Sequence, residues 1–231
     1  MSDDISVVAR NGGAESVVSA DPSNWPESQR YELDFWRNQW PHRHLSVSEI
    51  QEVRHRDAMW LLGNMGFTKA GSDYAYQGFE GRVLEVGCGP MGFFEKLEGV
   101  SVVSQDSLMA LYASNLDFSS LGQRGAVLYI DTPVADIVER FDFVVCSNVL
   151  DHTGDWISFL IDCVSRLEEG GELLLITDSR GVPAPGHTQI FNHDQLVNVL
   201  KLLGAQGFKV DSFTREDGEH CDFRHYLRAQ F

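Results

Sequence analysis

The clearest indication of the fold comes from the stretch Val83-Leu84-Glu85-Val86-Gly87-Cys88-Gly89-Pro90-Met91-Gly92. Its apolar start ends in Gly-x-Gly, and the apolar residues Phe93, Phe94 and Leu97 follow. This pattern indicates a buried strand that turns tightly into a helix over 91–97. Glycines in such a turn let the backbone approach a ligand closely, and open parallel sheets bind ligands at the carboxyl ends of their strands. We therefore predict a nucleotide-like ligand at this turn.

Two ligand classes fit the turn. Gly87-x-Gly89-x-x-Gly92 matches the dinucleotide fingerprint, and Asp106 lies at the distance expected for the ribose-binding acid of that fingerprint. Glu85 opposes this interpretation, because a carboxylate beside the turn repels a pyrophosphate and attracts a cation. If Glu85 is instead a solvated residue at the strand end, its charge does not discriminate between the two ligand classes.

An apolar strand followed by acid-x-Gly-x-Gly resembles the first motif of the class I S-adenosylmethionine-dependent methyltransferases. Their cofactor carries an α-ammonium and a sulfonium and no phosphate, so an acidic turn suits it electrostatically. The resemblance covers residues 80–231 and implies a Rossmann-like fold with S-adenosylmethionine as the cofactor. It also implies cofactor contacts from the turn residues Glu85, Gly87, Cys88 and Gly89.

Composition narrows the function classes. A chain of 231 residues is most simply one domain with an N-terminal appendage, and its formal net charge of −16 repels phosphate backbones. We therefore expect a small-molecule substrate and no nucleic-acid partner.

No apolar stretch reaches membrane-spanning length and no signal-peptide pattern begins the chain, so we expect no membrane partner and a cytoplasmic location. The four cysteines form no Cys-x-x-Cys pair, and no set of histidines shows metal-ligand spacing, so neither disulfides nor a metal site are expected.

The part of the chain before the glycine turn divides into two segments. Residues 1–25 are rich in Ser, Asp, Gly and Asn without periodicity, which predicts a flexible leader. Residues 26–80 predict a helical cap, because aromatic residues from Tyr31 to Trp40 fall at helical spacing and Ser46-x-x-Glu49 forms a capping box for a second helix. The resemblance implies that this cap covers the cofactor and shapes the substrate pocket. Aromatic side chains that merely pack against the sheet are the alternative.

Residues 81–231 predict an α/β domain in which five apolar strands alternate with helices, which implies a doubly wound, mostly parallel sheet. The strands are expected at 82–87, 101–105, 127–130, 141–147 and 172–177. After a helix capped by Asn192, two segments of period two flank Glu216-Asp217-Gly218. This pattern indicates a C-terminal antiparallel hairpin and a total of seven strands. Such a hairpin is typical of the methyltransferase fold and unusual for a dinucleotide-binding domain.

Polar residues follow three of the expected strands. Asp106, after the second strand, can accept hydrogen bonds from two vicinal ribose hydroxyls, and the resemblance gives it that role, which is compatible with an N-cap position. Ser107 is expected beside the adenosine. After the third strand, the resemblance implies an adenine contact from Asp131 and Thr132, where a plain turn is the alternative. After the fourth strand, it implies a main-chain contact from Asn148 to the ammonium of the methionine part.

Two histidines are candidate catalytic residues. His152 follows the fourth strand, and His187 lies in a loop rich in Pro and Gly after the fifth strand. An unperturbed imidazole titrates near neutrality and can take a proton from an acceptor hydroxyl. A loop-ordering role is the alternative for His152, and a plain surface position is the alternative for His187.

We therefore predict an S-adenosylmethionine-dependent methyltransferase that acts on a hydroxyl of a small molecule, such as a sugar or another polar metabolite. Methyl transfer is a direct displacement, so the absence of a visible nucleophilic triad agrees with it. The three-glycine match also fits an NAD-dependent oxidoreductase, which is the second interpretation. A non-catalytic protein that retains the fold is the third. The sequence predicts neither the identity of the acceptor nor the oligomeric state.

Overall fold

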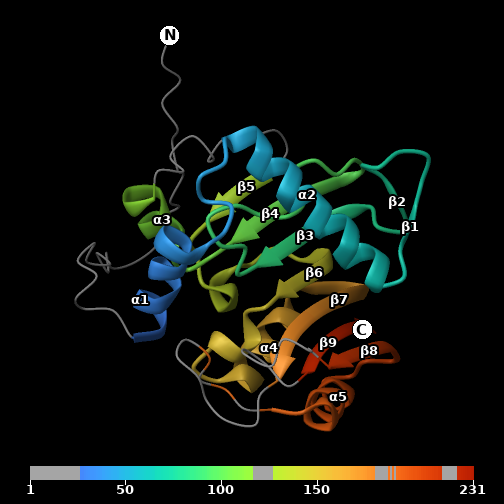
Figure 1. Ribbon diagram of the computed structural model, residues 1–231. Helices are drawn as coiled ribbons and strands as arrows, with labels where there is room; N and C mark the ends of the chain where they lie inside the picture. Colours follow the sequence, from blue (N-terminus) through green and yellow to red (C-terminus); the bar gives the residue numbers. More distant parts are fainter. Residues whose placement is uncertain (1–26, 117–126, 180–186, 188, 190, 215–222) are drawn as a thin grey trace.

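The centre of the fold is a seven-stranded sheet in the order β5-β4-β3-β6-β7-β9-β8 (Figure 1). The computed structural model of the chain describes residues 27–116, 127–179, 187, 189, 191–214 and 223–231. The expected leader over 1–25, the expected hairpin turn at 216–218 and Cys221 lie outside these residues.

Five strands of the sheet pair in parallel, and two C-terminal strands are added to them by antiparallel pairing. The parallel strands are β3 (Gly81–Val86), β4 (Val100–Gln105), β5 (Val127–Ile130), β6 (Phe141–Ser147) and β7 (Leu167–Ser179). The strand β9 (Phe223–Gln230) pairs antiparallel with β7, and β8 (Gly207–Thr214) pairs antiparallel with β9. The predicted α/β fold with a mostly parallel seven-stranded sheet and a C-terminal antiparallel pair is therefore confirmed.

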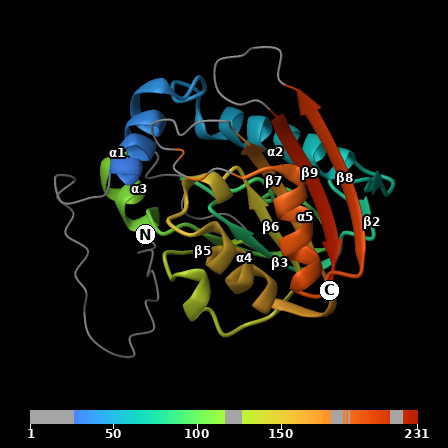
Figure 2. The ribbon, with the colours of Figure 1, turned by 90° about the horizontal axis from the view of Figure 1, so that it is seen from below.

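Helices cover both faces of the sheet. The N-terminal elements are α1 (Glu27–Asp34), a π-helical turn η2 (Phe35–Gln39) and α2 (Val47–Asn64). The later helices are α3 (Met109–Asn115), α4 (Trp156–Ser165) and α5 (His193–Leu202), with the short 3-10 turns η3 (Val134–Asp136) and η4 (Leu150–His152). The helix α2 crosses one face of the sheet, and α4 and α5 lie on the other (Figures 1 and 2). A two-stranded sheet of β1 (Thr68–Lys69) and β2 (Tyr76–Gln77) follows α2.

Among the described helices, none is long and apolar enough to cross a membrane.

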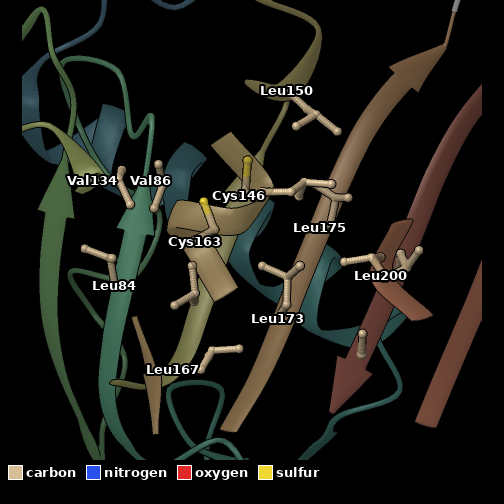
Figure 3. Packing of buried hydrophobic residues seen from close by; sticks show 14 of the residues in the cluster. Leu84, Val86, Val134, Cys146, Leu150, Cys163, Leu167, Leu173, Leu175 and Leu200 are labelled. Atoms are coloured by element: carbon tan, nitrogen blue, oxygen red, sulfur yellow. The ribbon is translucent and has the colours of Figure 1, made fainter. Parts of the chain in front are cut away.

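The alternation of side chains along β3 divides the core into two layers. Leu84 and Val86 pack among residues of β6, β7, α4 and α5, including Cys163 and Leu175 (Figure 3). Val83 lies on the opposite face, in the layer that contains Leu61 and Leu62 of α2. Because successive side chains of a strand point to opposite faces, Glu85 points toward α2 as well.

The helix predicted over 91–97 is wrong. These residues form turns and irregular backbone. The Phe93 N–H donates to Glu85 Oε1 over 2.8 Å, so a buried side chain takes the place of a helical carbonyl acceptor. The Gly87 N–H likewise donates outside the turn, to the Gln105 carbonyl over 2.7 Å. The glycine turn is therefore a loop held by its neighbours.

Candidate functional site

A cavity of about 440 Å³ opens where the carboxyl ends of β3, β4 and β6 meet. This volume lies in the range of small-molecule sites. The sheet contributes Gly87, Asp106 and Asn148 to its walls, and α1 contributes Gln29 and Glu32. The cavity therefore lies between the glycine turn and the N-terminal helix, at the edge of the sheet where open parallel sheets bind ligands.

The glycine turn is packed so closely that Gly87 and Gly89 have no room for a side chain. Gly87 and Gly89 have φ values of 65° and 67°, a backbone conformation that favours glycine. A Cβ at Gly87 would lie 2.1 Å from a methyl group of Val149, and a Cβ at Gly89 would lie 2.7 Å from the Trp36 ring. The cap predicted over the cofactor site thus rests directly on the turn.

Asp106 joins the cavity to the glycine turn. Its Oδ2 accepts a hydrogen bond from the Gly89 N–H and its Oδ1 accepts one from the Leu108 N–H, each over 2.9 Å. Burial raises the pKa of Asp106 to about 6, although both hydrogen bonds favour the ionised form. A carboxylate oxygen has two lone pairs. The residue can therefore hold the turn and still accept hydrogen bonds from a ligand.

Glu85 lies behind the turn and is not among the residues that line the cavity. Its carboxylate accepts hydrogen bonds from the Phe93 N–H over 2.8 Å and from Ser104 Oγ over 2.9 Å. Burial raises the pKa of Glu85 to about 7, against the opposing effect of the Arg54 charge. A Cβ at Gly92 would lie 2.3 Å from Glu85 Oε2, so the third glycine makes room for this carboxylate.

The other predicted cofactor residues divide into two groups. Ser107 and Asn148 line the cavity, and Asn148 has a φ of 56°, which is uncommon outside glycine. Cys88 is buried in the turn, and Asp131 and Thr132 follow β5; these three are not among the lining residues. The structure therefore brings part of the predicted set to one cavity.

The two candidate histidines meet at a buried aspartate. Asp151 is fully buried in η4, and its Oδ2 lies 2.6 Å from Nδ1 of His187. The rings of His152 and His187 are 4.2 Å apart between centroids, and His152 lines the cavity. A carboxylate that holds one ring nitrogen of an imidazole leaves the other nitrogen available to take a proton. Sequence reasoning missed Asp151, for which the only signal was its place beside His152.

The same three residues can also hold an ion. One possible ligand atom from each of Asp151, His152 and His187 lies within 4.8 Å of the others. The sequence spacing predicted no metal-ligand set, because these residues come from two loops far apart in the chain. The cluster therefore supports either proton transfer or metal binding.

The cap adds a carboxylate that sequence reasoning also missed. Glu32 Oε1 accepts a hydrogen bond from Trp36 Nε1 over 2.8 Å, and Glu32 Oε2 lies 3.9 Å from His152 Nδ1. Burial raises the pKa of Glu32, while the nearby His152 opposes that change. The described residues that line the cavity include Glu32 and Asp106 and no lysine or arginine. The cavity therefore has an acidic character.

A family model described as a methyltransferase domain matches residues 5–225. Two curated relatives have similar sequences. The ubiquinone biosynthesis O-methyltransferase of Chelativorans sp. (strain BNC1) is 31% identical over 117 residues, which cover 47% of this chain and 45% of that protein. The mitochondrial ubiquinone biosynthesis O-methyltransferase of Candida albicans is 30% identical over 128 residues, or 52% of this chain and 39% of that protein. The chain thus spans less than half the length of these relatives.

Among solved structures, the N-methyltransferase NodS from Bradyrhizobium japonicum WM9, in complex with S-adenosyl-L-homocysteine, has a similar fold. The TM-score is 0.59 at 16% sequence identity, and the match covers 89% of this chain and 98% of NodS. At this identity the likeness concerns the fold alone.

Proposed function

This chain belongs to the methyltransferase-domain family, and from that premise we propose that it transfers a methyl group from S-adenosylmethionine to a hydroxyl oxygen of a small molecule. The names of the two curated relatives favour oxygen. The NodS neighbour is an N-methyltransferase, so the fold by itself does not select the acceptor atom.

The chemistry of the cavity walls fits this methyl donor. Gly87 presents backbone without a side chain, Asn148 lines the same cavity, and Asp106 presents acceptors for ribose hydroxyls. The acidic lining, with Glu32 and Asp106 and no described lysine or arginine, suits a sulfonium cation and opposes a pyrophosphate. Glu32 and Asp106, and not Glu85, are thus the carboxylates that would attract the sulfonium. When bound, the donor supplies the methyl group and leaves as a neutral thioether.

The pair of Asp151 and His187 is the observation that carries the choice of oxygen. A hydroxyl must lose its proton as the new C–O bond forms, whereas a thioether leaving group takes none. His187 Nε2 accepts that proton, while Asp151 holds Nδ1 at 2.6 Å and stabilises the imidazolium that forms. His152 lies between this pair and Glu32 and lines the cavity. The polar lining residues Gln29 and Thr153 favour a sugar or another polar metabolite as the acceptor.

The test uses isotopically labelled S-adenosylmethionine and an extract of polar metabolites, with mass spectrometry as the readout. The wild-type protein is expected to produce at least one labelled methyl ether. His187→Asn and Asp151→Asn are expected to slow its formation about 100-fold or more, the usual contribution of a general base. Calorimetry is expected to give the same S-adenosylhomocysteine affinity for both variants as for the wild type. His44→Asn, at an exposed position, is the matched control.

Three results would contradict the proposal. Tight binding of NAD without binding of S-adenosylhomocysteine would favour an oxidoreductase. Binding of S-adenosylhomocysteine without any labelled product would favour a non-catalytic protein. Loss of activity on chelation, with recovery on adding a divalent cation, would replace the proton-transfer role of the cluster by metal binding.

A further inference from the structure

Arg54 of α2 is a buried cation that binds the glycine turn from the side opposite the cavity. It is 8% exposed. Its Nε donates to the Met91 carbonyl over 2.9 Å, and its Nη2 donates to the Cys88 carbonyl over 3.1 Å. The guanidinium carbon lies 3.7 Å from the centroid of the Phe93 ring. Burying a charge is costly unless it is well paired, and here the backbone carbonyls of the glycine turn supply two of the partners.

Each peptide held by Arg54 is held from its other side as well. The Cys88 carbonyl accepts from Arg54, and the N–H of the same peptide, at Gly89, donates to Asp106 Oδ2 over 2.9 Å. The Met91 carbonyl accepts from Arg54, and the N–H of that peptide, at Gly92, donates to the Tyr129 hydroxyl over 3.1 Å. Because a trans peptide is planar, its C=O and N–H point in opposite directions. Arg54 thereby fixes the rotation of both planes.

This fixation matters because the turn has little conformational preference of its own. Gly87 and Gly89 lack the side chains that would restrict φ and ψ. No described residue between 87 and 93 is helical. If the peptide between Cys88 and Gly89 rotated, Asp106 would lose one of its two backbone donors, and its carboxylate would no longer be held at the cavity wall.

We propose that Arg54 is a positioning residue for the methyl donor, acting through the peptide between Cys88 and Gly89 on the carboxylate of Asp106. The proposal rests on the function inferred above. Arg54 is not among the residues that line the cavity, so it acts without touching the ligand. A planar guanidinium fork can hold two carbonyls at once, whereas the single ammonium of lysine cannot reproduce that geometry. Arg54→Lys therefore removes the orientation while it retains the charge.

The experiment measures S-adenosylhomocysteine affinity by calorimetry for Arg54→Lys and Arg54→Met, with thermal melting to report folding. Both variants are expected to bind S-adenosylhomocysteine at least about tenfold more weakly than the wild type, because each loses hydrogen bonds from a charged group. Arg56→Lys and Arg56→Met, at an exposed position of the same helix, are the controls and are expected to bind like the wild type. Since Arg54→Lys keeps the charge and most of the side chain, it is the variant to interpret if Arg54→Met does not fold.

A double-mutant cycle distinguishes positioning from general stabilisation. If Arg54 acts through Asp106, Arg54→Lys combined with Asp106→Asn is expected to bind no more than about twofold more weakly than the weaker single variant. A merely structural role would lower the melting temperature and leave the two losses of affinity additive. Unchanged affinity in folded Arg54→Lys, or additive losses, would overturn the proposal. A wild-type protein that binds no S-adenosylhomocysteine would overturn the proposed function itself, which is a separate result.

Discussion

At the scale of single residues, Asp106 combines a structural role with the ligand-binding role that we propose for it. Its two oxygens hold Gly89 and Leu108 through backbone N–H groups, and the same carboxylate lines the cavity. A protonated carboxyl group donates a hydrogen bond where an ionised one accepts. The affinity of the cavity for a ribose should therefore depend on the protonation of this one group.

We expect S-adenosylhomocysteine to bind more weakly as the pH falls below about 6. The pKa of Asp106 is raised to about 6 in the folded protein, so the accepting carboxylate is present above that pH and is lost below it. Asp106→Asn is expected to weaken binding by about 1.5 to 3 kcal/mol and to remove most of the pH dependence. Calorimetry across the acidic and neutral range measures both effects.

Asp136→Asn serves as the control for this prediction, because Asp136 is an exposed acid away from the cavity. It should retain both the affinity and the pH dependence of the wild type. A variant Asp106→Asn with wild-type affinity would show that the ribose is held elsewhere.

At the scale of elements, α2 connects a local capping signal to the glycine turn. Its first residue is preceded by Ser46, which forms a complete capping box with Glu49, as the sequence predicted. Further along the same helix, Arg54 holds the turn, and Leu61 and Leu62 enter the core beneath the sheet. The helix therefore contributes both to stability and to the shape of the site.

Ser46→Ala is expected to lower the free energy of unfolding by about 1 kcal/mol, because it leaves the Glu49 N–H in the first turn without its side-chain acceptor. Chemical denaturation measures this change. Ser48→Ala, at an exposed position in the first turn of the same helix, should change the stability by less than about 0.5 kcal/mol. Equal effects of the two substitutions would show that the capping box contributes nothing specific.

At the scale of the whole molecule, charge favours the cationic donor over its neutral product. The chain has a net charge of −16, and the described part of the cavity wall carries carboxylates without a lysine or arginine. At an ionic strength of about 0.1 M, salt largely screens such fields beyond about 10 Å. S-adenosylmethionine carries one more positive charge than S-adenosylhomocysteine, so the two ligands should respond differently to ionic strength.

We expect the association rate of S-adenosylmethionine to fall by about two- to fivefold between low and physiological salt, as for electrostatically steered ligands. The rate for S-adenosylhomocysteine should change little. Stopped-flow fluorescence with both ligands provides the comparison, and parallel salt dependence for the two would contradict it.

The strands of an α/β sheet and the sheet edge where the cavity opens could be predicted from local patterns in the sequence. Strand ends such as Gln105 and Ser147 could be found because burial and periodicity are local signals, and residues at the carboxyl ends of parallel strands share one edge of the sheet. Gly87, Asp106, Ser107 and Asn148 line the cavity for this reason, and their contacts with the cofactor stay a prediction.

Contacts between side chains from distant parts of the chain could not be predicted from the sequence, because they depend on how the whole chain packs. Glu85 lies behind the turn because strand alternation directs it toward α2, where Arg54 is buried. Asp151 and His187 are 36 positions apart in the chain, and no local pattern encodes a contact of 2.6 Å between two loops. Secondary structure follows from interactions between near neighbours in the sequence, whereas a hydrogen-bonded site depends on distances that are fixed only when the whole chain has packed.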